Sequence, residues 1–314
     1  MYEFIIKGSI GIKHIIHILF ICIVFHPLIS TTFSSPAPRE FKIVASFSLL
    51  KNWIDVLTRN IPDNISIIST KSLVPLKSDP HVYQITPMDA KALEEADLII
   101  TIGLSFECWM NNYASPSSTN NTLFQAATGV DARLTPAPDP HVWHDVQKVR
   151  QMVANIAKAL CEKLPEAADI INDNARAYDS ELVKLDLWIR NALEKVPYEK
   201  RKIITTHDAF YYYGKTYDVK FYAPIGLSTE AEADSKTVAQ LINQIKSESI
   251  KAIFFENLAN RSIIRQIAEE TGVQINEGAV LYADSLSEKD GVAGDYSAMM
   301  RHNTTLIVDA LQNK

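Results

Sequence analysis

The chain has 314 residues, of which 47% are hydrophobic and 22% charged, a balance that argues against a disordered or fibrous protein and suits a globular one with two lobes. Its formal net charge of -6 and acidic isoelectric point argue against a nucleic-acid surface, and no cluster of Lys and Arg would form a basic stripe. We therefore expect no nucleic-acid partner and no polyanionic ligand.

The first residues have the pattern of a secretory signal peptide. Lys7 and Lys13 precede an apolar run at residues 15–25, and small and polar residues follow at 34–37. This order of a basic region, an apolar region and a cleavage zone predicts export, with residues 1–37 removed. The mature protein would then begin near Ala37 or Pro38 and be periplasmic.

A membrane anchor is the alternative interpretation of this segment. The apolar run is short for a membrane span and His17 interrupts it, which favours cleavage. Cys22 follows Ile21, where the signal of a bacterial lipoprotein would have a small residue, so we do not expect a lipid anchor.

After this segment, strands and helices alternate. Apolar runs predict buried strands, and amphipathic spacing or a Thr cap predicts helices. We expect strands at 41–48, 65–72 and 97–103, and helices at 49–61 and 86–96. Residues 111–138, rich in Ser, Asn, Thr, Ala and Pro, are expected to form a long surface loop.

The middle of the chain is helical. Residues 145–164 form one predicted helix, and Pro165 starts a second, longer helical run that ends before Pro197. A helix of this length would cross a small domain from end to end, so we interpret it as a rigid connection between two lobes.

The alternation then resumes to the end of the chain. The predicted strands are 201–206, 219–225, 251–257 and 273–282, and the predicted helices are 208–217, 235–248, 260–271 and 296–311. The fold class expected is therefore α/β, with two Rossmann-like lobes of parallel sheet joined by one long linking helix. The predicted divisions are 38–164 for the N-terminal lobe, 165–197 for the linking helix and 198–314 for the C-terminal lobe.

Such an architecture places a ligand cleft at the carboxyl ends of the strands, where the lobes face each other. The tetrapeptide DPHV occurs twice, at 79–82 and 139–142, each time followed by an aromatic residue. The flanking residues differ, so these are two loops of similar chemistry and not repeated modules. Proline stiffens each turn, and we expect the Val and the aromatic ring to anchor the loop and position its histidine.

Four side chains are candidate metal ligands on this basis: His81, His141, His207 and Asp284. His207 and Asp284 each follow a predicted strand of the C-terminal lobe. Neutral imidazoles with one carboxylate suit zinc or another first-row divalent ion. Taken one at a time, each residue could instead be an ordinary polar group or a helix cap.

The other histidines beyond the leader are His144 and His302. Residues three apart on a helix share a face, so His144 could reach the same metal as His141. The alternative, which we favour, is an exposed neighbour or a residue that contacts a ligand without binding the metal. His302 is expected on the surface. Whether Cys108 and Cys161 pair is left open by the sequence.

The sequence resembles the metal-binding proteins of zinc and manganese ABC transporters, the cluster A-I class of solute-binding proteins. The resemblance covers nearly the whole mature chain. It rests on the segments DPHVYQITPMDAKALEEADLIITIGLSFECW, DPHVWHDV, THDAF, IKAIFFEN and YADSL, which occur in the order of the family. It implies that His81, His141, His207 and Asp284 bind the metal.

The resemblance also implies the cargo and the partner. The chain would capture one Zn²⁺, or else Mn²⁺, and deliver it to the membrane permease of its ABC transporter, acting as a monomer and not as an enzyme. Many zinc-specific members carry a loop rich in His and acidic residues, and residues 111–138 contain no histidine. Many manganese-binding members have glutamate at the position of His207, which favours zinc here. The family usually has an apolar residue at the position of His144.

Two other functions use the same residues. A zinc-dependent hydrolase would need an open coordination position and a general base, for which Asp208 is the candidate. A metal-binding surface adhesin is the other alternative, and the sequence has no feature that distinguishes it.

Overall fold

The computed structural model describes residues 40–110, 122–135 and 137–312, so the predicted signal peptide and Cys22 lie outside the described residues. The N-terminal lobe is built on a parallel sheet with the strand order β2-β1-β3-β4. Its strands are β1 (Glu40–Ala45), β2 (Ile67–Ser72), β3 (Leu98–Thr101) and β4 (Thr122–Gln125). All four residues of β3 are buried, as expected for a continuous apolar run in the interior of a parallel sheet.

Helices with apolar faces pack on this sheet: α1 (Ser48–Leu57), α2 (Pro87–Glu95) and α3 (Val146–Lys163). Local sequence defines their ends. Thr86 and Asp89 form a capping box at the start of α2, and the Asp145 side chain accepts a hydrogen bond from the backbone N–H of Gln147 at the start of α3. Short 3-10 turns occur at η1 (Cys108–Met110), η2 (Val142–His144), η3 (Pro165–Ala167) and η4 (Tyr198–Lys200).

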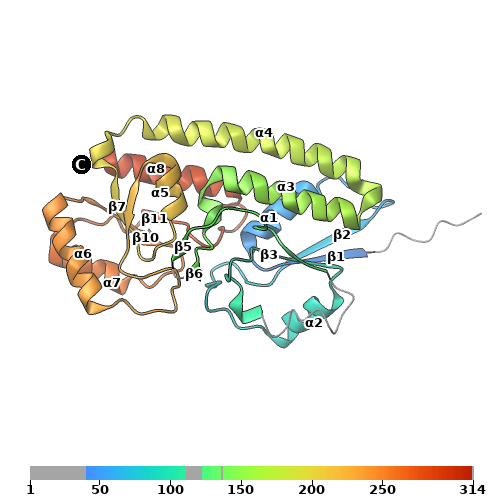
Figure 1. Ribbon diagram of the computed structural model, residues 1–314, viewed down its shortest axis with the longest axis horizontal. Helices are drawn as coiled ribbons and strands as arrows, with labels where there is room; N and C mark the ends of the chain where they lie inside the picture. The colour runs from blue at the N-terminus through green and yellow to red at the C-terminus, as the bar shows by residue number, and fades with distance from the viewer. Residues whose placement is uncertain (1–39, 111–121, 136, 313–314) are drawn as a thin grey trace, which may run out of the picture. The chain divides into compact units, whose positions relative to one another are not determined.

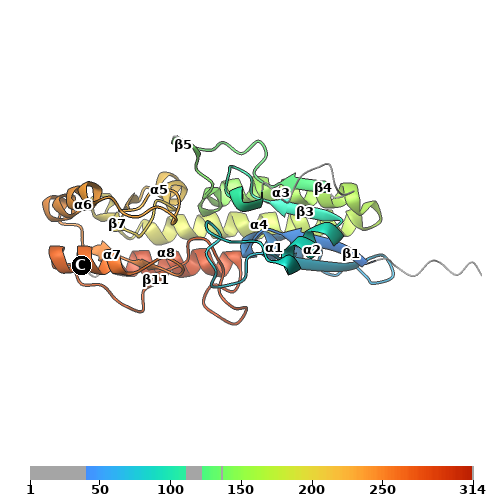
Figure 2. The same ribbon diagram turned by 90° about the horizontal axis from the view of Figure 1, so that it is seen from below.

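The helix α4 (Ala168–Leu193) is the long connection predicted from the sequence. At 1.5 Å per residue it is about 39 Å long, and Figure 1 shows it running over both lobes. Its buried residues include Ile171, Leu182 and Ile189, and Figure 2 shows it beside α8 (Tyr296–Gln312), with which it is in contact. It therefore packs along the two lobes and is not an isolated linker.

The C-terminal lobe contains two smaller parallel sheets. The first has the order β8-β7-β9, and the second pairs β10 with β11. The strands are β7 (Lys202–Ile204), β8 (Lys220–Tyr222), β9 (Ala252–Ile253), β10 (Phe255–Glu256) and β11 (Val280–Leu281). The surrounding helices are α5 (Tyr211–Tyr217), α6 (Ser235–Glu248), α7 (Ser262–Thr271) and α8.

Two predicted strands and one predicted loop are corrected. Residues 251–257 are two strands, because the chain leaves β7 after β9 and pairs with β11 from β10 onward. Most of residues 273–282 is not strand: Asn276 accepts from the backbone N–H groups of Gly278 and Ala279 and closes a turn before β11. The segment 111–138 is not simply a loop, since β4 completes the first sheet and β5 (Leu134–Thr135) pairs with β6 (Ala137–Pro138) in a short antiparallel hairpin.

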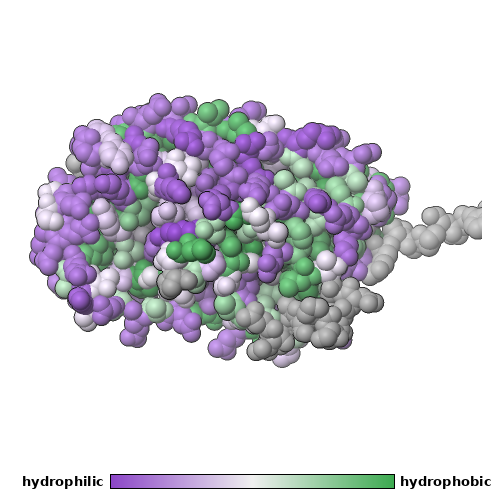
Figure 3. All heavy atoms as spheres, in the orientation of Figure 1, coloured by the Kyte–Doolittle hydropathy of each residue, from purple (hydrophilic) through white to green (hydrophobic). Residues whose placement is uncertain are grey.

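The core is shared between the lobes. One buried apolar cluster contains residues of both lobes and of α4, among them Ile43, Trp53, Leu185 and Met299. The face shown in Figure 3 is largely hydrophilic, with hydrophobic residues near the β5–β6 hairpin, where Leu134 is 76% exposed. Among the described helices, none has the length and apolar character needed to cross a membrane.

Candidate metal centre

The two DPHV segments have the same local structure. In each, the aspartate Oδ1 accepts a hydrogen bond from the backbone N–H of the histidine two residues later, at 2.8 Å for Asp79 and His81 and at 3.1 Å for Asp139 and His141. Asp can close such a turn with its own side chain, and the intervening proline restricts the backbone further. The repeated letters therefore encode a turn that holds one imidazole.

The hydrophobic residues after each histidine behave differently in the two loops. Val142 and Trp143 are fully buried, and the Trp143 indole donates to the carbonyl of Ala283 at 2.8 Å. Val82 is 46% exposed, so the expectation that it anchors its loop is wrong. That loop is held instead by the Tyr83 hydroxyl, which donates to Asp89, and by the Trp109 indole, which donates to the carbonyl of Pro80 at 2.8 Å.

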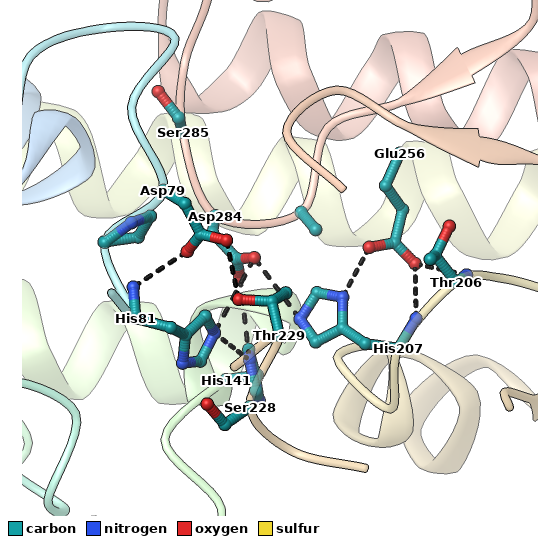
Figure 4. A network of polar contacts seen from close by, with 12 residues as sticks. Asp79, His81, His141, Thr206, His207, Ser228, Thr229, Glu256, Asp284 and Ser285 are labelled. Carbon is teal, nitrogen blue, oxygen red and sulfur yellow. Dashed lines mark hydrogen bonds and ion pairs between the residues drawn. The ribbon is translucent and has the colours of Figure 1, made fainter. Parts of the chain in front are cut away.

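The C-terminal lobe supplies His207 just after β7 and Asp284 just after β11. A buried carboxylate, Glu256 of β10, holds His207 by its backbone and its ring. Glu256 Oε1 accepts from the backbone N–H groups of Thr206 and His207 at 2.7 and 3.0 Å, and Oε2 pairs with His207 Nδ1. The Nε2 atom of His207 is thus left to face Asp284, as Figure 4 shows.

The structure brings all four predicted residues together. Their potential ligand atoms lie within 4.8 Å of one another. His141 Nε2 is 3.3 Å from His81 Nε2, and His207 Nε2 is 3.3 Å from Asp284 Oδ2. Asp284 Oδ1 is 3.6 Å from His141 Nε2, and Asp284 Oδ2 is 3.8 Å from His81 Nε2. Donors around a tetrahedral zinc ion, with bonds of 2.0–2.1 Å, are about 3.3 Å apart, so these spacings suit a first-row divalent ion.

Burial of these donors also fits an ion. The side chains of His141 and His207 are fully buried, and those of Asp284 and His81 are 3% and 6% exposed. His207 Nε2 and Asp284 Oδ1 have no hydrogen-bond partner within the described part of the chain. Buried polar atoms normally have a hydrogen-bond partner, so two that lack one within a group of four potential ligands are consistent with a site for a cation.

The surroundings set the protonation of the donors. Burial lowers the pKa of His81 to about 3, despite the opposing effect of Asp284. Burial alone would also lower the pKa of His207, but the carboxylates of Glu256 and Asp284 outweigh it and raise this pKa well above its usual value. Burial alone would raise the pKa of Asp284, and the neighbouring His207, His81 and His141 lower it instead. The pKa shifts thus favour the ionised form of Asp284, and any binding of a cation to His207 would require the release of a proton.

Histidines outside the set depart from the expectations. His144 is fully buried and not an exposed neighbour. Its ring packs on that of Phe210 with centroids 4.5 Å apart, and neither ring nitrogen has a hydrogen-bond partner among the described residues. His302 is half-buried, and its Nε2 donates to the carbonyl of Val280 at 2.9 Å, joining α8 to β11.

Cys108 and Cys161 are both free thiols, which answers the question that the sequence left open.

Several residues that contact the candidate ligands were not predicted from the sequence. Asp79 and Asp139 lie inside the recognised motif, and Asp139 Oδ1 also contacts the Nδ1 atom of His141 at 2.8 Å. Glu256 lies at the carboxyl end of the short buried strand β10, inside the predicted strand 251–257, so a search limited to residues after the strands did not include it. Asp208, the candidate base of a hydrolase, is paired with Arg133 at 2.8 Å, a contact that no local pattern predicts.

Comparison with known proteins identifies the family. Residues 43–310 match the family described as zinc-uptake complex component A, periplasmic. The manganese-binding lipoprotein MntA of Bacillus subtilis (strain 168) is 31% identical over 254 residues, which cover 78% of this chain and 83% of that protein.

Solved structures give the same result. The periplasmic zinc binding protein TroA from Treponema pallidum aligns with a TM-score of 0.81 at 26% identity, covering 87% of this chain and 99% of that one. The Mn-bound periplasmic metal binding protein from Candidatus Liberibacter asiaticus aligns with a TM-score of 0.75 at 28% identity, covering 87% of this chain and 100% of that one. The resemblance drawn from the motifs is confirmed, and the chain belongs to the family of zinc-uptake complex component A.

Proposed function

We propose that this protein is a periplasmic receptor that captures one divalent metal ion, zinc in preference to manganese, and delivers it to the permease of an ABC transporter. The observation that carries the proposal is the convergence of three imidazoles and one carboxylate from both lobes, in which the buried atoms His207 Nε2 and Asp284 Oδ1 have no hydrogen-bond partner among the described residues. The names of the relatives, which include manganese-binding and zinc binding proteins, support this class of cargo.

The preference for zinc rests on the donor set. Three nitrogen donors and one oxygen suit a tetrahedral site, and zinc exceeds manganese in affinity at mixed nitrogen and oxygen sites. With three neutral imidazoles and the single carboxylate of Asp284 as ligands, a divalent ion would keep a net charge of +1. Asp139 and Glu256, behind His141 and His207, supply further negative charge and orient the rings.

The arrangement also suggests how the ion is released. His81 and His141 come from the N-terminal lobe and His207 and Asp284 from the C-terminal lobe, so any separation of the lobes removes two donors at once. Docking on the permease would supply the energy for that separation. Four protein donors leave no open coordination position, which supports transport over hydrolysis.

Elemental analysis tests the proposal. The mature protein would be purified from the periplasm without added metal or chelator and compared with His81→Ala and with the control His302→Ala, which removes a histidine away from the centre. We expect about one zinc per chain in the wild type and in the control, and little in His81→Ala. Metal content that is substoichiometric and unaffected by His81→Ala would refute the receptor.

We further propose that residues 1–37 are cleaved, that the mature protein is a monomer, and that its divisions fall at 164/165 and 197/198. The signal-like order of the first residues and the extent of α4 support these points. N-terminal sequencing of the periplasmic protein and its mass in solution would check cleavage and monomeric state, and limited proteolysis would check the divisions.

A further inference from the structure

The aspartates of the two DPHV loops use their carboxylate oxygens for different purposes. Oδ1 of each holds the backbone of its own histidine, as described above. Oδ2 of each faces a group that reaches the C-terminal lobe. Asp79 Oδ2 accepts from the hydroxyl of Thr229 at 2.6 Å, and Figure 4 shows this contact beside the metal donors. Asp139 Oδ2 accepts from the Nη2 and Nε atoms of Arg133 at 2.7 and 3.1 Å.

Arg133 extends the second of these contacts across the lobes. Its Nη2 atom also donates to Asp208 Oδ2 at 2.8 Å, and Asp208 is the neighbour of the metal donor His207 in the chain. The guanidinium lies 3.9 Å from the centre of the Tyr211 ring. The Arg133 backbone N–H donates to the Tyr212 hydroxyl, which in turn donates to the carbonyl of Asp139. The segment before His141 is therefore bound to α5 by side chain and backbone.

We propose that Thr229 and Asp208 are positioning residues that control the release of the metal ion. We call the pair Asp79 and Thr229 the first clasp, and the group Asp139, Arg133 and Asp208 the second clasp. While both clasps are closed, His81 and His141 are held facing His207 and Asp284. The inference rests on the proposed function, because it assigns a role to these contacts only if the four donors bind an ion.

The exposure of the clasps suits groups that must open. The side chains of Arg133 and Asp208 are 21% and 39% exposed, whereas that of Asp139 is fully buried. Arg133 and Asp208 also line an open pocket of about 1070 Å³ between α5, β8 and α6. Water can therefore replace the contact with Asp208 when the lobes part, while Asp139 keeps its partners Arg133 and His141. The second clasp would break at Asp208 and leave the rest of the network intact.

Two substitutions test the clasps, each with a matched control. Asp208→Asn weakens the pair with Arg133, and Asp179→Asn changes the equivalent pair of Arg150 and Asp179 between α3 and α4, away from the donors. Thr229→Val removes the bond to Asp79, and Thr237→Val removes a Thr–Asp bond inside the C-terminal lobe, to Asp234. Zinc-loaded protein would be mixed with an excess of a fluorescent zinc chelator, and the rate of zinc release measured by stopped flow.

We expect each clasp variant to release zinc about tenfold faster, on the scale of one charge-assisted hydrogen bond, and each control to stay within about twofold of the wild type. Thermal unfolding of the metal-free proteins separates this effect from general destabilisation, which would act on variants and controls alike. Asp208→Glu, which keeps the charge, should recover much of the slow release. Equal release rates in the clasp variants and their controls would overturn the inference about the clasps but leave the proposed receptor function intact. A wild type that binds no zinc would refute both the inference and the proposed function.

Discussion

At the scale of single residues, the arrangement of the four candidate ligands depends on carboxylates outside that set. Glu256 fixes both the backbone and the Nδ1 atom of His207, so that Nε2 faces the other donors. Such outer contacts fix the orientation of a ligand ring and raise its basicity. The donors and the residues behind them therefore form one unit.

Replacing Glu256 with Gln tests this role. We expect zinc affinity, measured by competition with a chelator, to fall by about 10-fold to 100-fold. Glu107→Gln is the matched control, since Glu107 is also a buried carboxylate that accepts from two backbone N–H groups at a strand end but contacts none of the four donors by hydrogen bond. An equal loss in the control would assign the effect to stability and not to His207.

The buried His144 is expected to lower the stability of the folded protein at acidic pH. Burial lowers its pKa to about 3 in the folded protein, whereas an unfolded histidine titrates near 6.5. Below pH 6.5 the unfolded chain binds a proton that the folded chain does not, so the free energy of unfolding falls as the pH falls from 6.5 toward 3. At pH 5 this amounts to about 2 kcal/mol relative to neutral pH.

His144→Phe should therefore lose less stability between pH 7.5 and pH 5 than the wild type, because Phe does not titrate and can pack on Phe210. Urea unfolding of metal-free protein at the two pH values measures the difference, with His302→Phe as the control histidine. A pH response of His144→Phe identical to that of the wild type would contradict this account.

At the scale of elements, the turn that follows β3 requires a glycine at position 103. Gly103 has a φ of +84°, and a Cβ there would lie 3.1 Å from the side chain of Gln125 on β4. Both strain and crowding oppose a side chain. We expect Gly103→Ala to lower the free energy of unfolding by about 1 to 3 kcal/mol, measured by urea denaturation. Gly226→Ala is the control, because no atom lies within 4 Å of its Cβ position; a similar loss there would argue against this reason.

Elements with strong local signals were predictable from the sequence. The capped helices α2 and α3 and the long α4 occur where periodicity and caps place them, because those signals lie within each segment. The split of residues 251–257 was not predictable, because it depends on which neighbouring strand is available at each residue. The four candidate ligands were selected from the two DPHV turns and from the ends of predicted strands, which are local signals, whereas Thr229 and Arg133 have their contacts with partners far along the chain.

At the scale of the whole molecule, the shared core predicts cooperative unfolding. The same buried cluster includes residues of the first sheet, α4 and α8, so unfolding of either lobe would expose part of the interior that the other lobe shares with it. We expect the metal-free mature protein to unfold in one calorimetric transition with equal calorimetric and van't Hoff enthalpies. Free zinc at about 100 times its dissociation constant should raise the free energy of unfolding by about 2.7 kcal/mol. Two resolved transitions in the metal-free protein would show that the lobes are independent.

The same core limits how far the lobes can part. Trp143 of the N-terminal lobe donates to Ala283, and the Tyr296 hydroxyl of α8 donates to the carbonyl of Trp143, both at 2.8 Å. We expect release to involve only a small separation of the lobes or a local displacement of loops, because a wide opening would break this buried interior.

The free thiol of Cys108 provides a means of observing such a displacement. Cys108 is exposed, Cys161 is less so, and cleavage of the predicted leader would remove Cys22. The next residue, Trp109, is bonded to Pro80, the residue before His81. A fluorescent label on Cys108 would therefore lie beside the loop that carries His81, and its emission would report whether that loop moves when zinc is added or removed.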